Sequence, residues 1–308
     1  MASPKKEEIF IYELSAQQLQ NLKISPPIAI FLNLYQAHLD HFQNFQEYQE
    51  AKETIALFQK KDDYFIYNAD EAELRRLAKK NKAVKIAISL EKEADGYLKD
   101  NWLYWREEKI IEVKEIPLVG RFNLYNVLAA IASAKLLGVS TESIRKGIKE
   151  FRALPHRLEF IGRFRGIDFY NDSLATLPEP AMFAIEAFDK RLETILLGGH
   201  EAGQNFKGLA KKILESEIKN IILFLPTGAR IKKEIEKIVQ EEKREERGKE
   251  INYFFVENME EAIKIVFNKT GQEKVCLLSP ASPSFGVFRD YKERGELFKK
   301  YIEIYGQK

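Results

Sequence analysis

The sequence of 308 residues contains a single cysteine, Cys276. One cysteine excludes an internal disulfide framework and favours a protein of the reducing cytoplasm. Cys276 lies inside the apolar run KVCLLS, and no histidine is near it in the sequence. We therefore expect a buried structural thiol at this position and not a nucleophile.

Long apolar runs and an excess of one charge are also missing. No stretch approaches the about 20 apolar residues that span a bilayer, and the N-terminal MASPKKEEIF has no apolar core of a secretory signal. The 49 basic and 47 acidic residues give a net charge of only +2. No run of one sign is long enough for a nucleic-acid surface. We expect neither a membrane nor a nucleic acid as partner.

The third absence is a phosphate-binding loop. Such a loop, GxxxxGK(S/T), holds phosphates with successive backbone N–H groups and a lysine at the start of a helix. The nearest Gly and Lys pairs, at 147–149 and 248–249, lack the other residues of the motif. These 308 residues therefore carry no P-loop.

The sequence does contain a regular alternation of short apolar runs and helical segments. This alternation predicts an α/β fold, and in the second half a mostly parallel sheet with helices on both faces. We place the domain boundary near Ala153–Pro155, giving domains 1–153 and 154–308. Strands are predicted at 8–14, 27–34, 63–68, 84–89, 167–171, 193–199, 220–226, 251–257 and 274–280, an antiparallel excursion at 97–116, and helices at 44–59, 71–81, 120–139 and 141–151.

Two segments of the second half combine site-like residues. ALPHRLEFIGRFRGIDFYNDSLAT (153–176) places Arg157 and Asp172 on either side of a predicted β-hairpin. LLSPASPSFGVFRDYKERGELF (277–298) follows the end of a predicted strand with Ser279 and Ser284. Ligands of α/β sheets bind at the carboxyl ends of the strands. The two segments therefore predict a binding site at this edge.

Together the two segments resemble the C-terminal half of the Mur ligases, most closely the branch that adds D-glutamate. The resemblance runs from Glu13 to about Tyr301. It implies a partial central domain, of the P-loop type but without the P-loop, followed by a Rossmann-like C-terminal domain; the family's N-terminal domain, which binds the UDP sugar, is not represented. The implied partners are ATP, Mg²⁺, UDP-N-acetylmuramoyl-L-alanine and D-glutamate. ATP would phosphorylate the muramoyl carboxylate, and the amine of D-glutamate would then attack the acyl phosphate in peptidoglycan synthesis.

In the first half, the resemblance assigns a magnesium site. The segment NLYQAHLDHFQNFQEYQEAK (33–52) is similar to a family motif in which His38 matches a metal ligand and Lys52 matches a lysine carried as a carbamate. A carbamate is in effect a carboxylate and can bind Mg²⁺. Glu13 matches a further magnesium ligand. The alternatives without the resemblance are a strand-end glutamate in water, a loop histidine and an exposed helical lysine.

The resemblance also assigns nucleotide and amino-acid sites. GRFNLYNVLAA (120–130) matches a nucleotide motif with Asn123 and Asn126 near the adenine; helix capping is the alternative. Arg157 and Asp172 would reach ATP when the domains close, and a guanidinium suits phosphate because its planar fork donates two bonds. The amino-acid site would contain Thr176, Ser284 and Tyr291.

The chain departs from the family pattern at several site positions. Leu174 replaces the lysine of NDSKAT, and Gly286 replaces an acid. Ala202 replaces a lysine in the segment GGHEAGQNF (198–206). A charge-assisted contact contributes about 1.5–3 kcal/mol. The loss of two such contacts would slow a reaction by roughly 10² to 10⁴ if their energies added.

Three hypotheses follow from this pattern. The chain belongs to a D-glutamate ligase whose P-loop is on another polypeptide or missing from the gene model, and alone it is inactive or severely impaired. Alternatively, it is a non-catalytic relative that binds a nucleotide or a protein partner. As a third alternative, it is an ATP-dependent amide ligase with a different amino-acid substrate, as Leu174 and Ala202 suggest.

Overall fold

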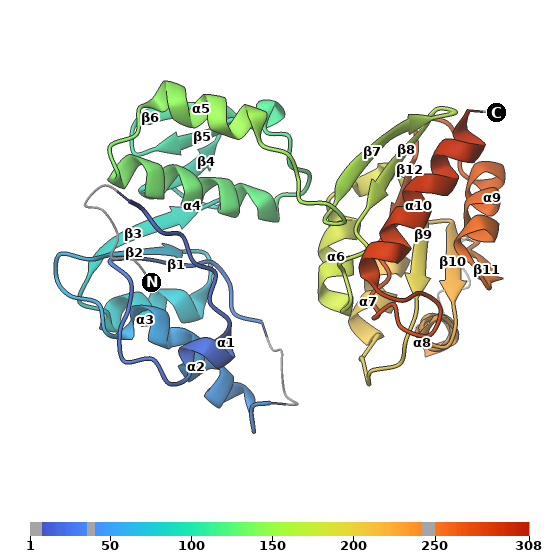
Figure 1. Cartoon of the computed structure of the whole chain (residues 1–308), viewed down its shortest axis with the longest axis horizontal. Helices are drawn as coiled ribbons and strands as arrows, with labels where there is room; N and C mark the ends of the chain where they lie inside the picture. Colours follow the sequence, from blue (N-terminus) through green and yellow to red (C-terminus); the bar gives the residue numbers. More distant parts are fainter. Residues whose placement is uncertain (1–7, 36–40, 242–249, 308) are drawn as a thin grey trace. The chain divides into compact units, whose positions relative to one another are not determined.

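The computed structural model describes residues 8–35, 41–241 and 250–307. The chain divides into two compact units. The first comprises Met1–Ile116 and Leu124–Glu150, and the second comprises Pro117–Asn123 and Phe151–Lys308. Each unit contains one six-stranded sheet, mostly parallel and covered by helices (Figure 1), which confirms the predicted α/β fold.

The strands of the first unit follow one another in chain order across the sheet, β1-β2-β3-β4-β5-β6. The first four are parallel, and β5 and β6 are antiparallel to their neighbours. The antiparallel part is the predicted excursion. In chain order the elements are α1 (Ala16–Leu19), β1 (Ile28–Phe31), α2 (Phe45–Leu57), β2 (Tyr64–Asn68), α3 (Ala72–Lys80), β3 (Val84–Ser89), β4 (Gly96–Lys99), β5 (Trp102–Trp105), β6 (Glu108–Glu112), the 3₁₀ turn η1 (Val113–Glu115), α4 (Phe122–Leu136) and α5 (Thr141–Glu150).

The short helix α1 packs against α2. Ala16 of α1 and Ala51 of α2 are buried in one small cluster with Phe42 and Tyr48. Ser15 caps α1 by accepting a bond from the backbone N–H of Gln18, whose side chain in turn accepts one from the N–H of Ser15. This reciprocal cap stabilises a helix of only four residues.

The predicted strand at 8–14 is wrong. In the part of the chain that the structure describes, these residues form no strand, and Ile9, Ile11 and Tyr12 are 65%, 94% and 73% exposed. A strand forms only where a neighbour pairs with its backbone. Among the described residues, the sheet ends at β1, which pairs only with β2. The apolar composition of the run carries no information about that pairing.

The sheet of the second unit has the order β11-β10-β9-β12-β8-β7. All pairs are parallel except the hairpin of β7 and β8, and the predicted hairpin is therefore confirmed. The elements are β7 (Glu159–Phe164), β8 (Ile167–Asn171), α6 (Pro178–Glu186), the 3₁₀ turn η2 (Asp189–Arg191), β9 (Leu192–Gly198), α7 (Lys207–Glu215), β10 (Asn220–Phe224), α8 (Thr227–Glu241), β11 (Asn252–Val256), α9 (Met259–Lys269), β12 (Val275–Leu278) and α10 (Tyr291–Gly306).

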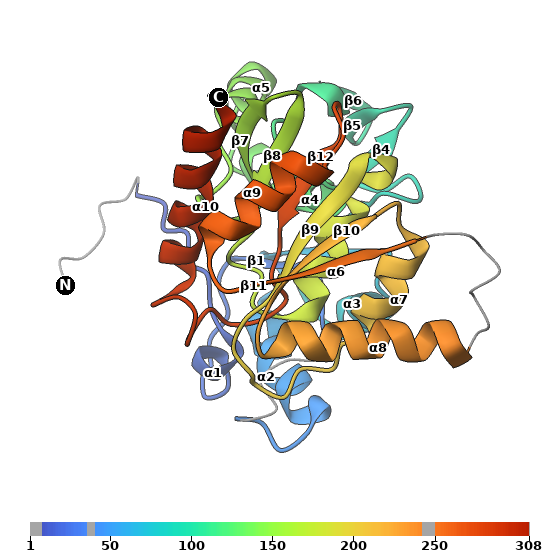
Figure 2. The ribbon, with the colours of Figure 1, turned by 90° about the vertical axis from the view of Figure 1, so that its right-hand side faces the viewer.

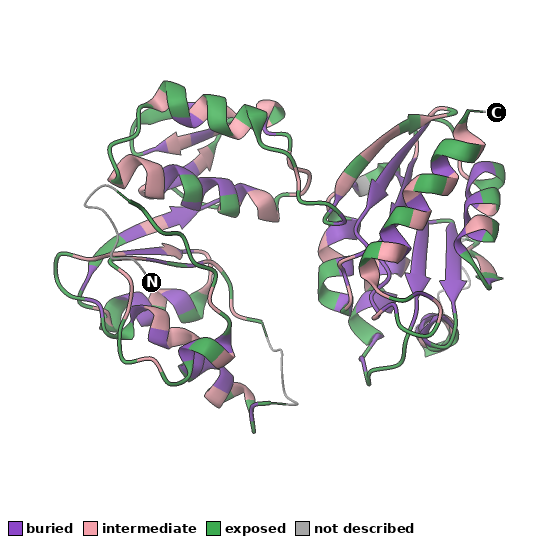
Figure 3. Ribbon diagram, in the orientation of Figure 1, coloured by how far each residue is buried: buried purple, intermediate pink, exposed green. Residues whose placement is uncertain are grey.

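Helices cover both faces of this sheet (Figure 2). Side chains alternate along each strand, so that Ile195 and Leu197 of β9 face one core and Leu196 faces the other. Helices α6, α7 and α8 complete the first core, and α9 and α10 complete the second. The central strands are buried along their length (Figure 3). Cys276 of β12 is fully buried as predicted, and burial raises the pKa of its thiol well above the usual value.

Among the described residues, no helix is both long and apolar enough to cross a membrane.

Candidate functional site

The carboxyl ends of β8 and β12 lie side by side in the second unit. These strands are parallel neighbours, and Leu278 is in register with Asn171. Asp172 and Ser279 are the next residues after the two strands, and the backbone N–H of Asp172 donates to the carbonyl of Leu278 at 2.7 Å. Two segments that are about a hundred residues apart in the sequence therefore meet at one edge of the sheet, as predicted.

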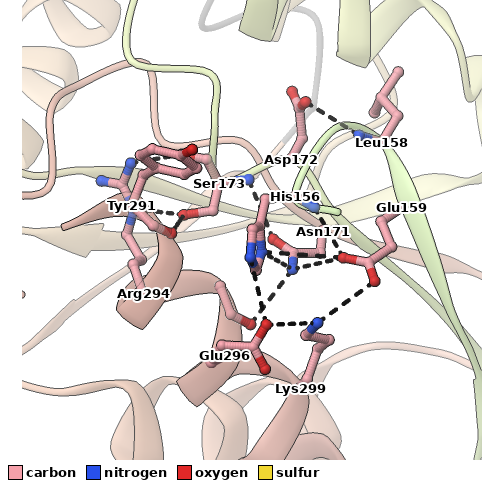
Figure 4. Close-up of polar contacts among 11 residues, drawn as sticks. His156, Leu158, Glu159, Asn171, Asp172, Ser173, Tyr291, Arg294, Glu296 and Lys299 are labelled. Atoms are coloured by element: carbon pink, nitrogen blue, oxygen red, sulfur yellow. Dashed lines mark hydrogen bonds and ion pairs between the residues drawn. The ribbon is translucent and has the colours of Figure 1, made fainter. Parts of the chain in front are cut away.

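Asp172 is a buried carboxyl group held by two neutral donors, and Figure 4 shows the bond from Leu158. The backbone N–H of Leu158 donates to Oδ1 at 3.2 Å, and the hydroxyl of Ser279 donates to Oδ2 at 2.8 Å. Burial raises the pKa of Asp172 to about 7, against the opposing effects of these bonds and of the Arg157 charge. The carboxyl group can therefore change its charge near neutral pH.

Arg157 is exposed between two buried neighbours. His156 and Leu158 are 6% and 7% exposed, and both have left-handed backbone φ angles, 67° and 45°. The backbone N–H of Arg157 closes a turn on the carbonyl of Leu154 at 3.1 Å. This geometry buries both neighbours and leaves the guanidinium accessible, where its charge acts on Asp172.

His156 anchors this turn to α10. Its Nδ1 lies 3.0 Å from the side-chain amide nitrogen of Asn171, and its Nε2 lies 3.4 Å from a carboxylate oxygen of Glu296. An amide nitrogen only donates, so Nδ1 is the acceptor and Nε2 carries the proton. Burial lowers the pKa of His156, which favours the neutral ring. Lys299 contacts Glu159 and Glu296 and closes the network.

The three residues assigned to the amino-acid site lie in the same two segments. Thr176 follows β8 in a turn closed by its N–H and the carbonyl of Leu174 at 2.9 Å. Ser284 is 3% exposed in the segment after β12, and Tyr291 begins α10. The carbonyl of Tyr291 accepts a bond from the hydroxyl of Ser173 at 2.7 Å. This bond joins the segment after β8 to α10.

Sequence reasoning missed Arg294, which is 0% exposed. Its guanidinium donates to the hydroxyl and the carbonyl of Ser173 and to the carbonyl of Ser282. A signal was present: Arg294 is four residues before Phe298 and eight before Ile302, both fully buried. This spacing places a basic residue on the apolar stripe of a helix.

The loop with Ala202 carries a different cation nearby. Arg230 of α8 contacts the carboxylate of Glu201 at 2.5 Å and donates to the carbonyl of Gln204 at 2.9 Å. Gln204 is 7% exposed, and its side-chain nitrogen has no hydrogen-bond partner among the described residues. Its oxygen accepts a bond from the N–H of Ala202 at 3.0 Å. The loop thus holds an unused amide donor.

In the first unit, Glu13 is close enough to Lys52 for its charge to act on the ammonium group. Lys52 is half-buried on α2, with Nζ 5.5 Å from the centre of the Tyr48 ring. Burial lowers the pKa of Lys52, and the charge of Glu13 partly opposes that shift. His38 lies outside the described residues. Within those residues, no group of three His, Cys, Asp or Glu side chains could hold a metal, so the magnesium site stays a prediction.

Asn123 and Asn126 both lie at the start of α4, as expected. The side-chain amide of Asn123 donates to the carbonyl of Val119 at 2.7 Å and so holds the turn before the helix. Asn126 is exposed in the next turn. Their assignment to an adenine site stays a prediction.

The sequence of the chain is similar to one known protein family and to individual members of that family. Residues 1–134 match the Mur ligase middle domain, and residues 156–282 match the Mur ligase glutamate ligase domain. UDP-N-acetylmuramoylalanine–D-glutamate ligase from Bacillus cereus (strain G9842) is 36% identical over 297 residues, and that from Bacillus thuringiensis (strain Al Hakam) is 37% identical over 298 residues. Both alignments cover 96% of this chain and 63% of the relative, so the chain spans less than two thirds of their length.

Solved structures share the fold at lower identity. MurF ligase from Thermotoga maritima in complex with ADP aligns with a TM-score of 0.63 at 18% identity, covering 91% of this chain and 63% of that one. MurF from Acinetobacter baumannii aligns with a TM-score of 0.67 at 18% identity, covering 91% of this chain and 60% of that one. At this identity the similarity concerns the fold alone.

Proposed function

Because the chain belongs to the Mur ligase family, we propose that it acts in the ATP-dependent joining of D-glutamate to UDP-N-acetylmuramoyl-L-alanine in peptidoglycan synthesis. The similarity to D-glutamate ligases over 96% of the chain supports this substrate pair. A cytoplasmic location belongs to the same proposal. The chain spans 63% of those relatives, and a polypeptide with a P-loop and a UDP-sugar site completes the reaction in this scheme.

One observation carries the proposal. At the carboxyl ends of β8 and β12, the accessible guanidinium of Arg157 is close enough to the buried carboxyl of Asp172 for its charge to act on it, and the following segments carry Thr176 and Ser284. We assign Arg157 to a phosphate and Asp172 to the nucleotide. Thr176, Ser284 and Tyr291 are assigned to the amino acid. A phosphate and an amine-bearing substrate held at one edge is what acyl-phosphate chemistry requires.

The first unit would hold Mg²⁺. Glu13 and Lys52 are near each other, but an ammonium at Lys52 would repel a cation, so the fit requires Lys52 as its carbamate. His38 is the third assigned ligand. Bound Mg²⁺ would neutralise phosphate charge. Asn123 and Asn126 are assigned to the adenine.

The proposal is tested by measuring ligation in a completed system, in which a second polypeptide supplies the P-loop and UDP-sugar domains. We would mix the chain with a polypeptide that carries the P-loop and UDP-sugar domains of a Bacillus relative, add ATP, Mg²⁺, muramoyl precursor and D-glutamate, and detect the amide product by mass spectrometry. We expect product only when both polypeptides are present, and a loss of about 10² or more in kcat for Arg157→Ala, since a phosphate contact is removed at the transition state. Completed protein that makes no product with D-glutamate would contradict the proposal.

A different amino-acid substrate is the second candidate. It is favoured by Leu174, by Ala202 and by the unused amide donor of Gln204 in the same loop. The completed system would be offered a panel of D- and L-amino acids, acidic and neutral. A kcat/KM that is tenfold higher for another amino acid than for D-glutamate would select this candidate.

A further inference from the structure

We infer that Arg294 is a positioning residue that holds together the two amino-acid-site segments, residues 171–176 and 279–284. The role of these segments in an amino-acid site rests on the proposed function, whereas the hydrogen bonds of Arg294 do not depend on it. Arg294 lies in the first turn of α10, and Figure 4 shows it beside Ser173 and Tyr291. Thr176 and Ser284 of the assigned amino-acid site lie at the ends of these segments and would not keep their relative positions if the segments moved independently.

Three hydrogen bonds carry the inference. The guanidinium Nε donates to the hydroxyl of Ser173 at 3.0 Å, and one terminal nitrogen donates to the carbonyl of Ser173 at 2.8 Å. The other terminal nitrogen donates to the carbonyl of Ser282 at 3.0 Å. Ser173 follows β8 and Ser282 follows β12, so a single planar guanidinium bonds to both segments. Only the planar fork of arginine presents donors in several fixed directions at once.

The charge of Arg294 is not compensated by an acid. Desolvation alone lowers its pKa to about 9, and no acidic side chain among the described residues contributes to the shift. The group therefore stays cationic at neutral pH while it is fully buried. A buried charge without an acidic partner is costly, because burial removes its hydration and only the three hydrogen bonds replace it. Its positive charge favours an anion, such as a substrate carboxylate, at this edge of the sheet.

The contacts of Arg294 continue to a third strand end. Ser282 is hydrogen bonded through its hydroxyl to that of Thr227 at 2.8 Å. Thr227 in turn accepts a bond from the N–H of Gly199 at 2.8 Å. Gly199 begins the loop after β9 that contains Ala202. The buried chain of Ser173, Arg294, Ser282, Thr227 and Gly199 thus links the ends of β8, β12 and β9.

Amide hydrogen exchange of the full chain, measured by mass spectrometry, tests the inference. For Arg294→Met we expect the amides of 171–176 and 279–284 to exchange at least tenfold faster, and those of β9 and β10 less than threefold faster. Arg294→Lys should restore only part of the protection because an ammonium lacks the fork. Phe298→Leu, in the same helix but in the apolar core, is the control for general destabilisation.

The pattern of exchange rates distinguishes a positioning role of Arg294 from general stabilisation. Equal acceleration across the second unit in Arg294→Met, as in the Phe298→Leu control, would reduce Arg294 to a general stabiliser and overturn the inference, as would unchanged loops. If Arg294→Met does not fold, the comparison of Arg294→Lys with the control makes the same distinction. In the completed ligase we expect Arg294→Lys to raise the KM for D-glutamate at least tenfold with the KM for ATP within threefold. Failure of the wild type to turn over would count against the proposed function only, because the exchange result needs no catalysis.

Discussion

At the scale of single residues, the burial of Asp172 opposes the ionisation of its carboxyl group. Its folded-state pKa of about 7 lies above the ordinary value of 3.8 for an aspartate because burial disfavours the carboxylate. The folded chain therefore binds this proton more tightly than the unfolded chain. The stability from this proton is fully present below pH about 4 and is lost as the pH rises through about 7.

Asp172→Asn should remove this pH dependence. Asparagine keeps an acceptor for the N–H of Leu158 and stays neutral, so the variant should gain on the wild type by at most about 4 kcal/mol between pH 4 and 8. Urea unfolding of both proteins at several pH values, followed by circular dichroism, measures the difference. A difference that does not change with pH would contradict the raised pKa.

Lys52 is a second residue whose burial opposes its charged form. Burial lowers the pKa of its ammonium, which increases the fraction of neutral amine, and CO₂ adds only to a neutral amine. We expect a carbamate signal by ¹³C NMR in labelled bicarbonate that is absent from Lys52→Arg and unchanged in the exposed control Lys60→Arg. Glu13→Gln removes the charge that raises this pKa and should strengthen the signal. A signal that survives in Lys52→Arg would assign the carbamate elsewhere.

At the scale of elements, α10 is the support of the site, and a glycine lets it approach closely. A Cβ on Gly295 would lie 2.2 Å from Nδ1 of His156 and 3.0 Å from the amide nitrogen of Asn171. The carbonyl of Gly295 also accepts a bond from that amide at 3.4 Å. The glycine is needed here for close contact between α10 and the segments that carry Arg157 and Asp172.

Gly295→Ala should therefore destabilise the second unit by about 1–3 kcal/mol through overpacking. The matched control is Gly147→Ala in the exposed face of α5, where a Cβ meets nothing within 4 Å. There alanine should stabilise by about 0.5–1 kcal/mol because it favours helix. Urea denaturation measures both. Equal effects of the two substitutions would show that His156 yields easily and that the close approach is not required.

Elements were predictable where the sequence pattern itself determines them. The runs 167–171, 220–226 and 274–280 became β8, β10 and β12, whose residues are buried, because continuous apolar runs between helices have few other solutions. The run 8–14 has the same composition, yet it has no strand to pair with in the described structure. Pairing is a property of the sheet, which a single run cannot reveal.

At the scale of the whole molecule, the site was predictable only in part. Asp172 and Ser279 could be placed together because both follow parallel strands, and the resemblance to the Mur ligases supplied their roles. Arg294 could not be assigned in the same way. Its partners Ser173 and Ser282 are defined by the packing of α10 against the strand ends, and long-range packing of this kind leaves only a weak trace in the sequence, a basic residue on an apolar stripe.

Nucleotide affinity should show how much of the ATP binding this chain provides and how much the P-loop polypeptide provides. The 308 residues contain Arg157 and Asn126 but no P-loop, and the P-loop supplies most of the backbone donors for the phosphates. One exposed guanidinium offers little beyond a screened charge-assisted contact. We therefore expect calorimetry of this chain with Mg-ATP to show a Kd no tighter than about 1 mM, and micromolar affinity once the P-loop polypeptide is added. Micromolar binding by the chain alone, lost in Arg157→Ala, would mean that the second unit forms a phosphate site of its own and that the division of labour proposed above is wrong.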